Sequence, residues 1–479
     1  MKRTLEREIK LRAGDGFSMP PSLGEPIVPR RFASTYHDTG DHRLAAVGIT
    51  LRYRVGETRT GVWQLKLPRG AARLELELPG GEKHVPARFG DLVSATTRGR
   101  SLEPVATLDT VRQGFLVREN GRELAEVVID EVTVTAGSGQ RGGRRFEELE
   151  VELVDGDEQA LRRIERDLRA AGACDADGRP KVFQALDLSR SAPARPKRKA
   201  PPADHLIAKL EEQYGAILAN DPGTRLGTDA EHLHQHRVAI RRLRALLRAA
   251  RPMLDREWVK SLRDELRWAG GALGDVRDFD VLVEHLQGDA AQLDERERGA
   301  MDVLLSQLGD RRAQARKVML AELRTPRYLE LLDRLERELR APPVANHSVR
   351  LESIAGKEFK RLRKVMKKLG PESPDEELHA ARISVKRARY AAELAEHVRG
   401  KKALKFIDAA KALQDVLGDH QDAHVAEGVI RELAETAPAD QAFAAGMVAE
   451  RQRERRREAR AAYPGVWDEL KRRGKAAWV

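Results

Sequence analysis

The sequence predicts a two-domain α+β protein, with a β-rich N-terminal domain followed by an all-α C-terminal domain. Its 479 residues are too many for one ordinary hydrophobic core. Residues 1–190 hold short runs in which apolar and charged residues alternate, whereas residues 204–479 hold long segments with apolar residues three and four positions apart. Between them, residues 191–203 have the sequence SAPARPKRKAPPA, a composition typical of a stiff, exposed linker.

Charge and cysteine content restrict the partners and the compartment. The net charge is +11, and residues 1–190 contain 31 Lys and Arg against 30 Asp and Glu, so nearly all of the basic excess lies C-terminal to them. This excess favours a polyanionic partner for the C-terminal domain. The single cysteine, Cys174, excludes a disulfide framework and fits a reducing compartment. Because no apolar run of about 20 residues occurs, we expect a cytoplasmic protein with no membrane partner.

The first predicted strand carries the sequence EREIK. In an extended strand Glu6, Glu8 and Lys10 point to one face, whereas the apolar Ile9 and Leu11 point to the other. A half-buried strand with one face in water explains a single segment of this kind. The pattern recurs, however, in later runs such as LRYRV, WQLKL, RLELEL and EELEVEL. The charged faces of these later strands carry Arg52, Arg54, Lys66, Arg73, Glu75, Glu77, Arg112, Glu148, Glu150 and Glu152.

The repeated strands with one charged face and one apolar face have two interpretations. An open antiparallel sheet with one face in water gives this alternation. A closed sheet gives it too, and its charged faces then line a polar interior. Two observations favour a closed sheet. Acids and bases share the charged faces at the same two-residue spacing in each run. The opposite faces are continuously apolar, as expected when helices pack on the outside of the sheet. In such an interior, arginines and lysines can hold a polyanion and carboxylates can hold divalent cations.

The N-terminal segments resemble the CYTH family, the triphosphate tunnel metalloenzymes. The resemblance is carried, in order, by EREIK, YHDTGDHRLAAVGITLRYRVGE, WQLKLP, RLELE and FEELEVELVDGD, and it covers about residues 1–190. It implies an eight-stranded antiparallel tunnel with outer helices, which binds a linear triphosphate together with Mg²⁺ or Mn²⁺. The family includes inorganic, thiamine and RNA triphosphatases and one class of adenylate cyclase.

The resemblance also implies a role for each charged position. The metal ligands would be Glu6, Glu8, Glu148, Glu150 and Glu152. The substrate-binding bases would be Arg52, Arg54, Lys66, Arg73, Arg112 and, in the segment RPKVFQAL, Lys181. The catalytic groups would be Glu6, Glu8, Lys10, Lys66, Glu75 and Glu77. A second basic residue accompanies the position of Arg112 in the family, and either Arg118 or Arg122 can supply it here.

The C-terminal domain contains an internal repeat. HQHRVAIRRLR, which starts at His234, aligns with HAARISVKRAR, which starts at His379. LGDVRDFDVL aligns with LGDHQDAHVA at nearly the same separation. Two matches at one separation predict two duplicated four-helix bundles, at about residues 204–340 and 346–479.

In each repeat the basic residues recur at helical spacing and form one stripe. The two stripes consist of Arg237, Arg241, Arg244 and Arg248, and of Arg382, Lys386 and Arg389. Carboxylates four residues away would usually neutralise a solvated face of this kind, and both stripes have almost none. The segment KEFKRLRKVMKK, residues 357–368, adds a third basic surface. The scarcity of aromatic residues disfavours nucleic acid as the polyanion, because single strands are held by base stacking.

Residues 204–479 resemble the CHAD family, the conserved-histidine α-helical domain, in the basic helix of each repeat and in the LGD segments, which we expect to form turns. The resemblance implies a basic pore or groove that binds inorganic polyphosphate. The binding residues would be His234, Arg237, Arg241, Arg244, His379, Arg382, Lys386 and Arg389. We expect the two histidines to form hydrogen bonds or to contact phosphate. We expect the acids of the LGD segments, Asp275, Asp278, Asp419 and Asp422, to cap helices or pair with the stripes.

These patterns together predict a metal-dependent hydrolase for inorganic triphosphate or a related triphosphate, joined to a module that binds long-chain polyphosphate. Mg²⁺ or Mn²⁺ would be the cofactor. The alternatives are a thiamine triphosphatase, an adenylate cyclase, or a non-catalytic protein that binds polyphosphate and associates with polyphosphate granules. Retention of the acids and bases along the predicted strands disfavours the non-catalytic alternative.

Overall fold

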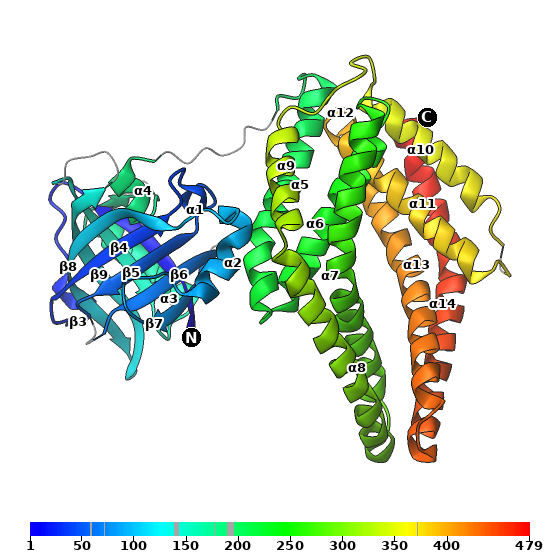
Figure 1. The fold of residues 1–479 in the computed structure, drawn as a ribbon, viewed down its shortest axis with the longest axis horizontal. Helices are drawn as coiled ribbons and strands as arrows, with labels where there is room; N and C mark the ends of the chain where they lie inside the picture. The colour runs from blue at the N-terminus through cyan, green and yellow to red at the C-terminus, as the bar shows by residue number, and fades with distance from the viewer. Residues whose placement is uncertain (58–59, 71, 138–142, 177, 189–195, 371) are drawn as a thin grey trace. The chain divides into compact units, whose positions relative to one another are not determined.

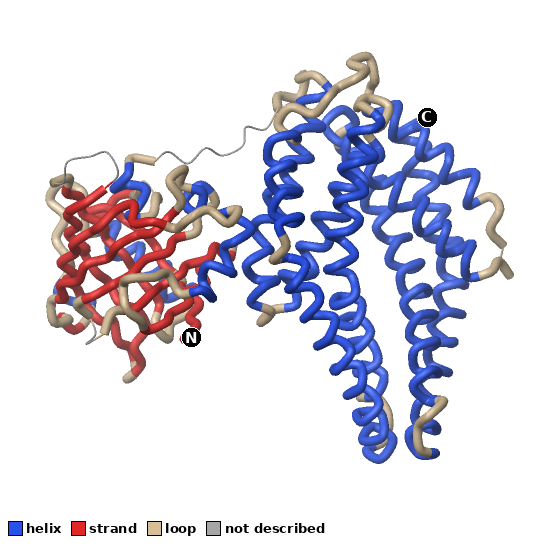
Figure 2. The backbone as a smooth tube through the Cα atoms, viewed as in Figure 1, coloured by secondary structure: helices blue, strands red, loops and turns tan. Residues whose placement is uncertain are grey.

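The chain divides into a β-rich unit and a helical unit. The structure, a computed structural model, describes residues 1–57, 60–70, 72–137, 143–176, 178–188, 196–370 and 372–479. The first unit, Met1–Ala192, contains the sheet, and the second, Pro193–Val479, is helical (Figure 1, Figure 2). Residues 191–195 of the predicted linker lie outside the described residues. Its last two residues already belong to a helix that begins at Pro202, because proline is favoured in the first helical turn.

Within the described residues, the first unit is one sheet of eleven strands. They are β1 (Lys2–Glu6), β2 (Glu8–Ala13), β3 (Glu25–Pro26), β4 (Arg30–Asp38), β5 (Thr50–Val55), β6 (Val62–Arg69), β7 (Ala72–Pro79), β8 (Glu103–Glu119), β9 (Arg122–Gly137), β10 (Arg145–Leu153) and β11 (Ala173–Asp175). Their order is β1-β7-β6-β5-β4-β8-β9-β10-β2-β11, with β3 paired to β8. The pairings are antiparallel, so side chains on one face of each strand meet those on the same face of its neighbours.

The two ends of this sheet meet at Arg7. β1 pairs with β7 at one end of the path and β2 pairs with β10 near the other, yet only Arg7 separates β1 from β2. The Leu153 N–H donates to the Arg7 carbonyl at 3.0 Å, which continues the pairing across the break. The sheet therefore closes around an interior. Its described residues form eleven strands where the sequence predicted eight, because the first strand is interrupted at Arg7 and two short strands, β3 and β11, are added.

Helices pack on the outer, apolar face of the closed sheet. The helices of this unit are α1 (Arg43–Ala46), α2 (Ala87–Thr97), α3 (Glu158–Ala170) and α4 (Lys181–Leu186), with a 3₁₀ turn, η1 (Pro21–Leu23). Leu161, Ile164 and Leu168 of α3 share a buried cluster with Val127 and Val151 of the sheet, and α4 packs in a second such cluster. Burying one such side chain contributes about 1.5–3 kcal/mol. The apolar half of the alternating pattern is used for this packing, which leaves the charged half for the interior.

The second unit consists of helices of very different length. They are α5 (Pro202–Leu226), α6 (Ala230–Ala249), α7 (Arg256–Ala290), α8 (Glu295–Leu323), α9 (Pro326–Glu338), α10 (Leu351–Met366), α11 (Asp375–Leu394), α12 (Glu396–Arg399), α13 (Lys401–Ala434) and α14 (Ala439–Trp478). Two long hairpins, α7 with α8 and α13 with α14, share a core that includes Met301 and Ile430 (Figure 1). The repeated basic segments lie on α6 and α11, which pack against each other. The division into two duplicated four-helix bundles stays a prediction.

The structure contradicts the turns predicted at the two LGD segments. Both segments lie inside long helices, α7 and α13. Their glycines permit close packing: Arg237 Nη1 donates to the Gly274 carbonyl at 3.2 Å, and a Cβ on Gly418 would lie 3.4 Å from Arg382 Nη2. A helical residue without a side chain lets a guanidinium lie against the helix backbone. Because the segments are helix interiors, their acids cap no helix.

The closeness of neighbouring strands in the sheet can be tested at Gly114 of β8. A Cβ added there would lie 2.0 Å from the Val127 carbonyl oxygen, so a backbone shift is unavoidable. We expect Gly114→Ala to lower the free energy of unfolding by on the order of 2 kcal/mol or more. Gly40→Ala is the control, because no atom lies within 4 Å of its added Cβ. Urea unfolding followed by circular dichroism would measure both, and equal midpoints would contradict the close approach.

Candidate functional site

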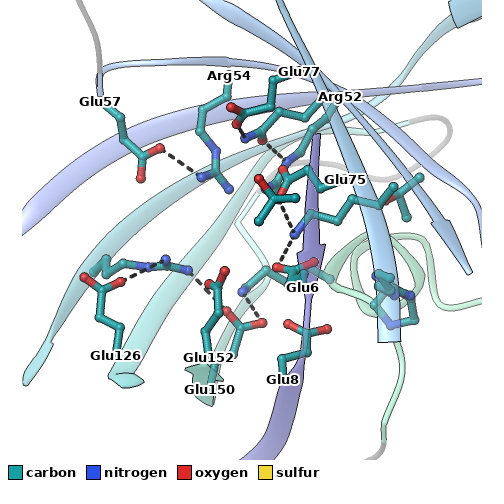
Figure 3. A pocket seen from close by; sticks show the side chains of 18 of the residues that line it. Glu6, Glu8, Arg52, Arg54, Glu57, Glu75, Glu77, Glu126, Glu150 and Glu152 are labelled. Carbon is teal, nitrogen blue, oxygen red and sulfur yellow. Dashed lines mark hydrogen bonds and ion pairs between the residues drawn. The ribbon is translucent and has the colours of Figure 1, made fainter. Parts of the chain in front are cut away.

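The interior of the closed sheet contains a highly charged cavity of about 260 Å³. In the described part of the chain, nine basic and eight acidic side chains line it, drawn from nine of the strands, from Glu57 and from the start of α4. Figure 3 draws the side chains of 18 of the lining residues, and those that it labels lie around the cavity. The cavity is lined by Glu6, Glu8, Lys10, Arg52, Arg54, Lys66, Arg73, Glu75, Glu77, Arg112, Glu150, Glu152 and Lys181, which are predicted site residues.

Strand register explains why acids and bases alternate around the cavity. Lys10 lies opposite Glu150 in the β2–β10 pair, and Lys66 lies opposite Glu75 in the β6–β7 pair. Lys66 Nζ also lies 2.5 Å from a carboxylate oxygen of Glu6, which comes from β1. Because cross-strand neighbours on one face are in contact, the two-residue spacing in the sequence becomes a network of ion pairs in the sheet.

The lysines of the cavity are held by several carboxylates at once. Lys10 Nζ lies 2.5 Å from Glu150 and 2.9 Å from Glu148. Burial lowers the pKa of Lys10, but the Glu150 and Glu148 carboxylates outweigh burial and raise it well above its usual value. Lys181, the first residue of α4, lies 2.8 Å from Asp130, 2.9 Å from Glu148 and 2.9 Å from Glu150. Both ammonium groups are therefore charged and fixed in position.

Glu148 is a predicted metal ligand that the structure places differently. It does not line the cavity; it is buried beneath Lys10 and Lys181 and also accepts a hydrogen bond from Gln184. Asp130, which the sequence did not single out as a site residue, is fully buried and binds Arg112 through two hydrogen bonds of 2.7 Å. These two acids hold the bases in place from behind the cavity wall.

Neither Arg118 nor Arg122 supplies the second base near Arg112. Arg118 pairs with Glu25 and Glu123, and Arg122 pairs with Asp155, all on exposed surface. The pairing of β8 with β9 shifts register between Val117 and Arg118, at the end of the hairpin. The base that lies opposite Arg112 is Arg30 of β4, which donates to Glu126 at 2.5 Å. Arg30 lies outside every alternating run, so its role depends on a pairing between distant segments.

Two further residues that the sequence analysis missed hold the cavity arginines. The Tyr36 hydroxyl lies 3.2 Å from Arg52 Nη1, and Arg52 Nε donates to Gln64 at 2.8 Å. Arg54 Nη1 donates to Glu57 at 2.9 Å. The alternation of β6 places Gln64 on the charged face, but Tyr36 and Glu57 have no comparable signal. The arginines are thus oriented before any ligand enters.

The carboxylates at one side of the cavity suit a divalent cation. Within the described residues, Glu6 Oε2 and Glu75 Oε1 are buried without a hydrogen-bond partner. Burial and the nearby Glu6 carboxylate raise the pKa of Glu152 to about 7. The described residues hold no ready-made group of three His, Cys, Asp or Glu metal ligands. Mg²⁺, however, is usually held by one or two carboxylates together with substrate phosphates, and this donor set fits that mode.

The basic stripes of the helical unit face each other where α6 packs against α11. Burial and the charges of Arg382, Arg241 and Arg389 lower the pKa of Lys386 to about 7, so bases from both repeats share one region. Arg237 donates to Asp278 at 2.6 Å, which is the pairing expected for an acid of an LGD segment.

The histidines of the helical unit have different surroundings. His379 Nδ1 lies 2.8 Å from Gln421 Oε1. Burial and the nearby Arg277 lower the pKa of the half-buried His234. His236 is fully buried between Thr224 and Tyr328, and burial lowers its pKa to about 4. It is part of the helix packing rather than of the basic surface.

Comparisons with known proteins agree with this architecture. The CYTH domain family matches residues 4–180 and the CHAD domain family matches residues 208–431. Two curated relatives, both described as uncharacterized and from two strains of Mycobacterium tuberculosis, are each 33% identical over 440 residues, which is 84% of this chain and 82% of theirs. The chain therefore belongs to the family of proteins in which a CYTH domain is followed by a CHAD domain.

Two solved structures are similar to part of this chain, and each of them matches over all or nearly all of its own length. PptA from Streptomyces chartreusis is 23% identical, covers 56% of this chain and 100% of its own, and gives a TM-score of 0.48. The CHAD domain from the plant Ricinus communis is 26% identical, covers 59% of this chain and 96% of its own, and gives a TM-score of 0.48. Among the described helices, none is both long and apolar enough to cross a membrane.

The supporting role of Asp130 leads to a stability prediction. Asp130→Asn would leave Arg112 and Lys181 buried with one fewer counter-charge, so we expect a loss of about 3 kcal/mol in the free energy of unfolding. Asp155→Asn is the control, because Asp155 and its partner Arg122 are both exposed. Chemical unfolding at neutral pH would measure both variants. A stable Asp130→Asn protein would show that the buried pairs are not required for the fold.

Proposed function

We propose that the tunnel hydrolyses inorganic triphosphate, or a related triphosphate, with the help of a divalent cation, and that the helical unit binds inorganic polyphosphate. The enclosed cavity is the observation that supports the proposal for the tunnel. Bases from several strands converge there beside two carboxylates that each have a buried oxygen without a hydrogen-bond partner among the described residues. A linear anion with several phosphates matches an interior lined along its length by guanidinium and ammonium groups.

Charge balance supports the need for a cation. The nine bases and eight carboxylates of the described cavity nearly cancel. A triphosphate adds about four negative charges at neutral pH, which this balance alone cannot neutralise. Glu6, Glu8, Glu150 and Glu152 are the carboxylates that would hold Mg²⁺ or Mn²⁺. Such an ion neutralises charge on phosphate oxygens and lowers the pKa of a bound water.

The side chains of the chain itself bind and orient the substrate. Lys10 and Lys66 are paired with carboxylates and can exchange these partners for phosphate oxygens without leaving their positions. Arg52 and Arg54 are already oriented by Gln64 and Glu57. Because phosphoryl transfer depends mainly on alignment and charge stabilisation, fixed cations of this kind are the main contribution that the protein has to make.

An inorganic substrate is favoured over an organic one. The described lining of the tunnel cavity is almost wholly charged or polar, and its one aromatic residue, Tyr36, lies within hydrogen-bonding distance of Arg52 through its hydroxyl. A thiamine triphosphatase or an adenylate cyclase would need apolar surface for the organic group. The deciding experiment is a hydrolysis assay with tripolyphosphate, thiamine triphosphate, ATP and long-chain polyphosphate, with Mg²⁺ and Mn²⁺ in separate reactions. Preference for either organic triphosphate would overturn the assignment.

Removing one carboxylate from the tunnel tests its catalytic role. Glu8→Gln keeps the shape of the side chain but removes its charge, so we expect kcat to fall on the order of a hundredfold, with a higher metal requirement. Glu147→Gln on β10 is the matched control, because Glu147 is exposed. Steady-state hydrolysis of tripolyphosphate at several metal concentrations would measure both variants. Normal turnover by Glu8→Gln would contradict the assigned role.

Lys386 predicts a pH dependence for polyphosphate binding. Its pKa of about 7 means that it is charged below neutral pH and loses its proton as the pH rises toward 8. A bound polyanion favours the charged form of Lys386. The affinity for polyphosphate should therefore fall between pH 6 and pH 8 when the salt concentration is held constant. Titration calorimetry with long-chain polyphosphate would measure this. Lys386→Arg should retain affinity at pH 8, and an unchanged pH profile in that variant would contradict the role of Lys386.

A further inference from the structure

A second cavity lies within the helical unit, between α6, α7, α10 and α11. It has a volume of about 320 Å³, which is in the range of small-molecule sites. Its lining differs from that of the tunnel. Basic side chains surround it, but Ala245, Ala249, Ile383 and Tyr390 give it an extensive apolar wall.

The described lining of this cavity has six basic side chains and one acidic side chain. Arg248 of α6, Arg263 of α7 and Arg387 of α11 meet there, and Glu358 is the one carboxylate among the described lining residues. Burial, followed by the charge of Arg387, lowers the pKa of Arg248 to about 10. In the described structure, the Nε atoms of Arg244 and Arg263 are buried without a hydrogen-bond partner. An anion at this position would relieve the repulsion between these bases.

The apolar wall contains an unsatisfied polar group of its own. Tyr390 is only 3% exposed, and its hydroxyl has no hydrogen-bond partner among the described residues. Leaving a buried hydroxyl unpaired costs about 1–3 kcal/mol. A polyphosphate chain has no apolar part and therefore gains nothing from the alanines, Ile383 or the tyrosine ring. The ligand that uses the whole lining combines phosphate with a flat, partly apolar group that carries hydrogen-bonding atoms.

We propose that this cavity binds a nucleotide, with its phosphates against Arg248, Arg263 and Arg387 and its nucleoside against the apolar wall and Tyr390. Glu358 pairs with Arg361 through one carboxylate oxygen, and its other oxygen can accept a hydrogen bond from an amino group of the base. Arg241, Arg244 and Lys386 also line the cavity and belong to the proposed polyphosphate surface. Nucleotide and polyphosphate therefore compete for the helical unit. The proposal does not depend on hydrolysis in the tunnel.

The first test compares ATP with tripolyphosphate on the full chain. Arg52→Ala with Lys66→Ala provides a background in which the tunnel is disabled, and calorimetry is done without metal. Both ligands carry a triphosphate, so charge alone predicts similar affinities. We expect ATP to bind about tenfold or more tightly, because only its nucleoside buries apolar surface. Equal affinities, or tighter binding of tripolyphosphate, would overturn the proposal.

A second test fills the cavity without removing charge. Ala249→Phe, in the same background, should abolish the preference for ATP while long-chain polyphosphate still binds along the stripes. Arg263→Ala should weaken ATP binding at least fivefold, whereas Arg296→Ala, which removes an exposed base of α8 outside the cavity, should not. Arg263→Ala gives the answer if Ala249→Phe fails to fold, as circular dichroism would show. Unchanged ATP affinity in a folded Ala249→Phe or Arg263→Ala protein rules the site out.

Discussion

The pairing of buried charges inside the tunnel is the constraint on which the first unit depends. A charge taken out of water without a partner costs many kcal/mol, so each ammonium and guanidinium group needs a carboxylate within reach. Arg112, Lys10 and Lys181 meet this need through Asp130, Glu148 and Glu150. A one-residue slip of any strand would turn its charges toward the apolar outer packing and its apolar residues toward the cavity. Register, closure at Arg7 and the position of α4 are therefore linked.

The two units handle positive charge in opposite ways. In the tunnel the described bases are nearly matched by acids, so an incoming anion has to exchange partners with carboxylates or arrive with a cation. In the helical unit, burial and the neighbouring bases of α6 and α11 together lower the pKa of Lys386 to about 7. An anion there fills an existing deficit of negative charge. We infer that ligand binding depends on metal in the tunnel and on salt and pH in the helical unit.

The two cavities differ in how much apolar surface lines them. The wall of the tunnel has almost no apolar side chain, because the strand alternation sends those residues outward to pack against α3 and α4. Helices have a different geometry: a stripe of bases on α6 runs beside small residues such as Ala245 and Ala249, and both line the same cavity. The difference in apolar surface between the two cavities thus follows from the secondary structure that builds each of them.

The class of each unit and most of the tunnel lining could be predicted from the residue pattern alone. Period-two alternation selects which residues share a face, and this is a local property of an extended chain, so Glu6, Lys66 and Glu150 could be assigned before any strand was paired. The tertiary structure decided which residues meet across strands and helices. It placed Arg30 opposite Arg112, Asp130 and Glu148 behind the wall, and the LGD glycines inside helices. It also assembled the helical cavity around Tyr390 from four separate helices. Contacts between distant segments depend on register and packing, and the sequence of one strand or helix does not specify which other element it contacts.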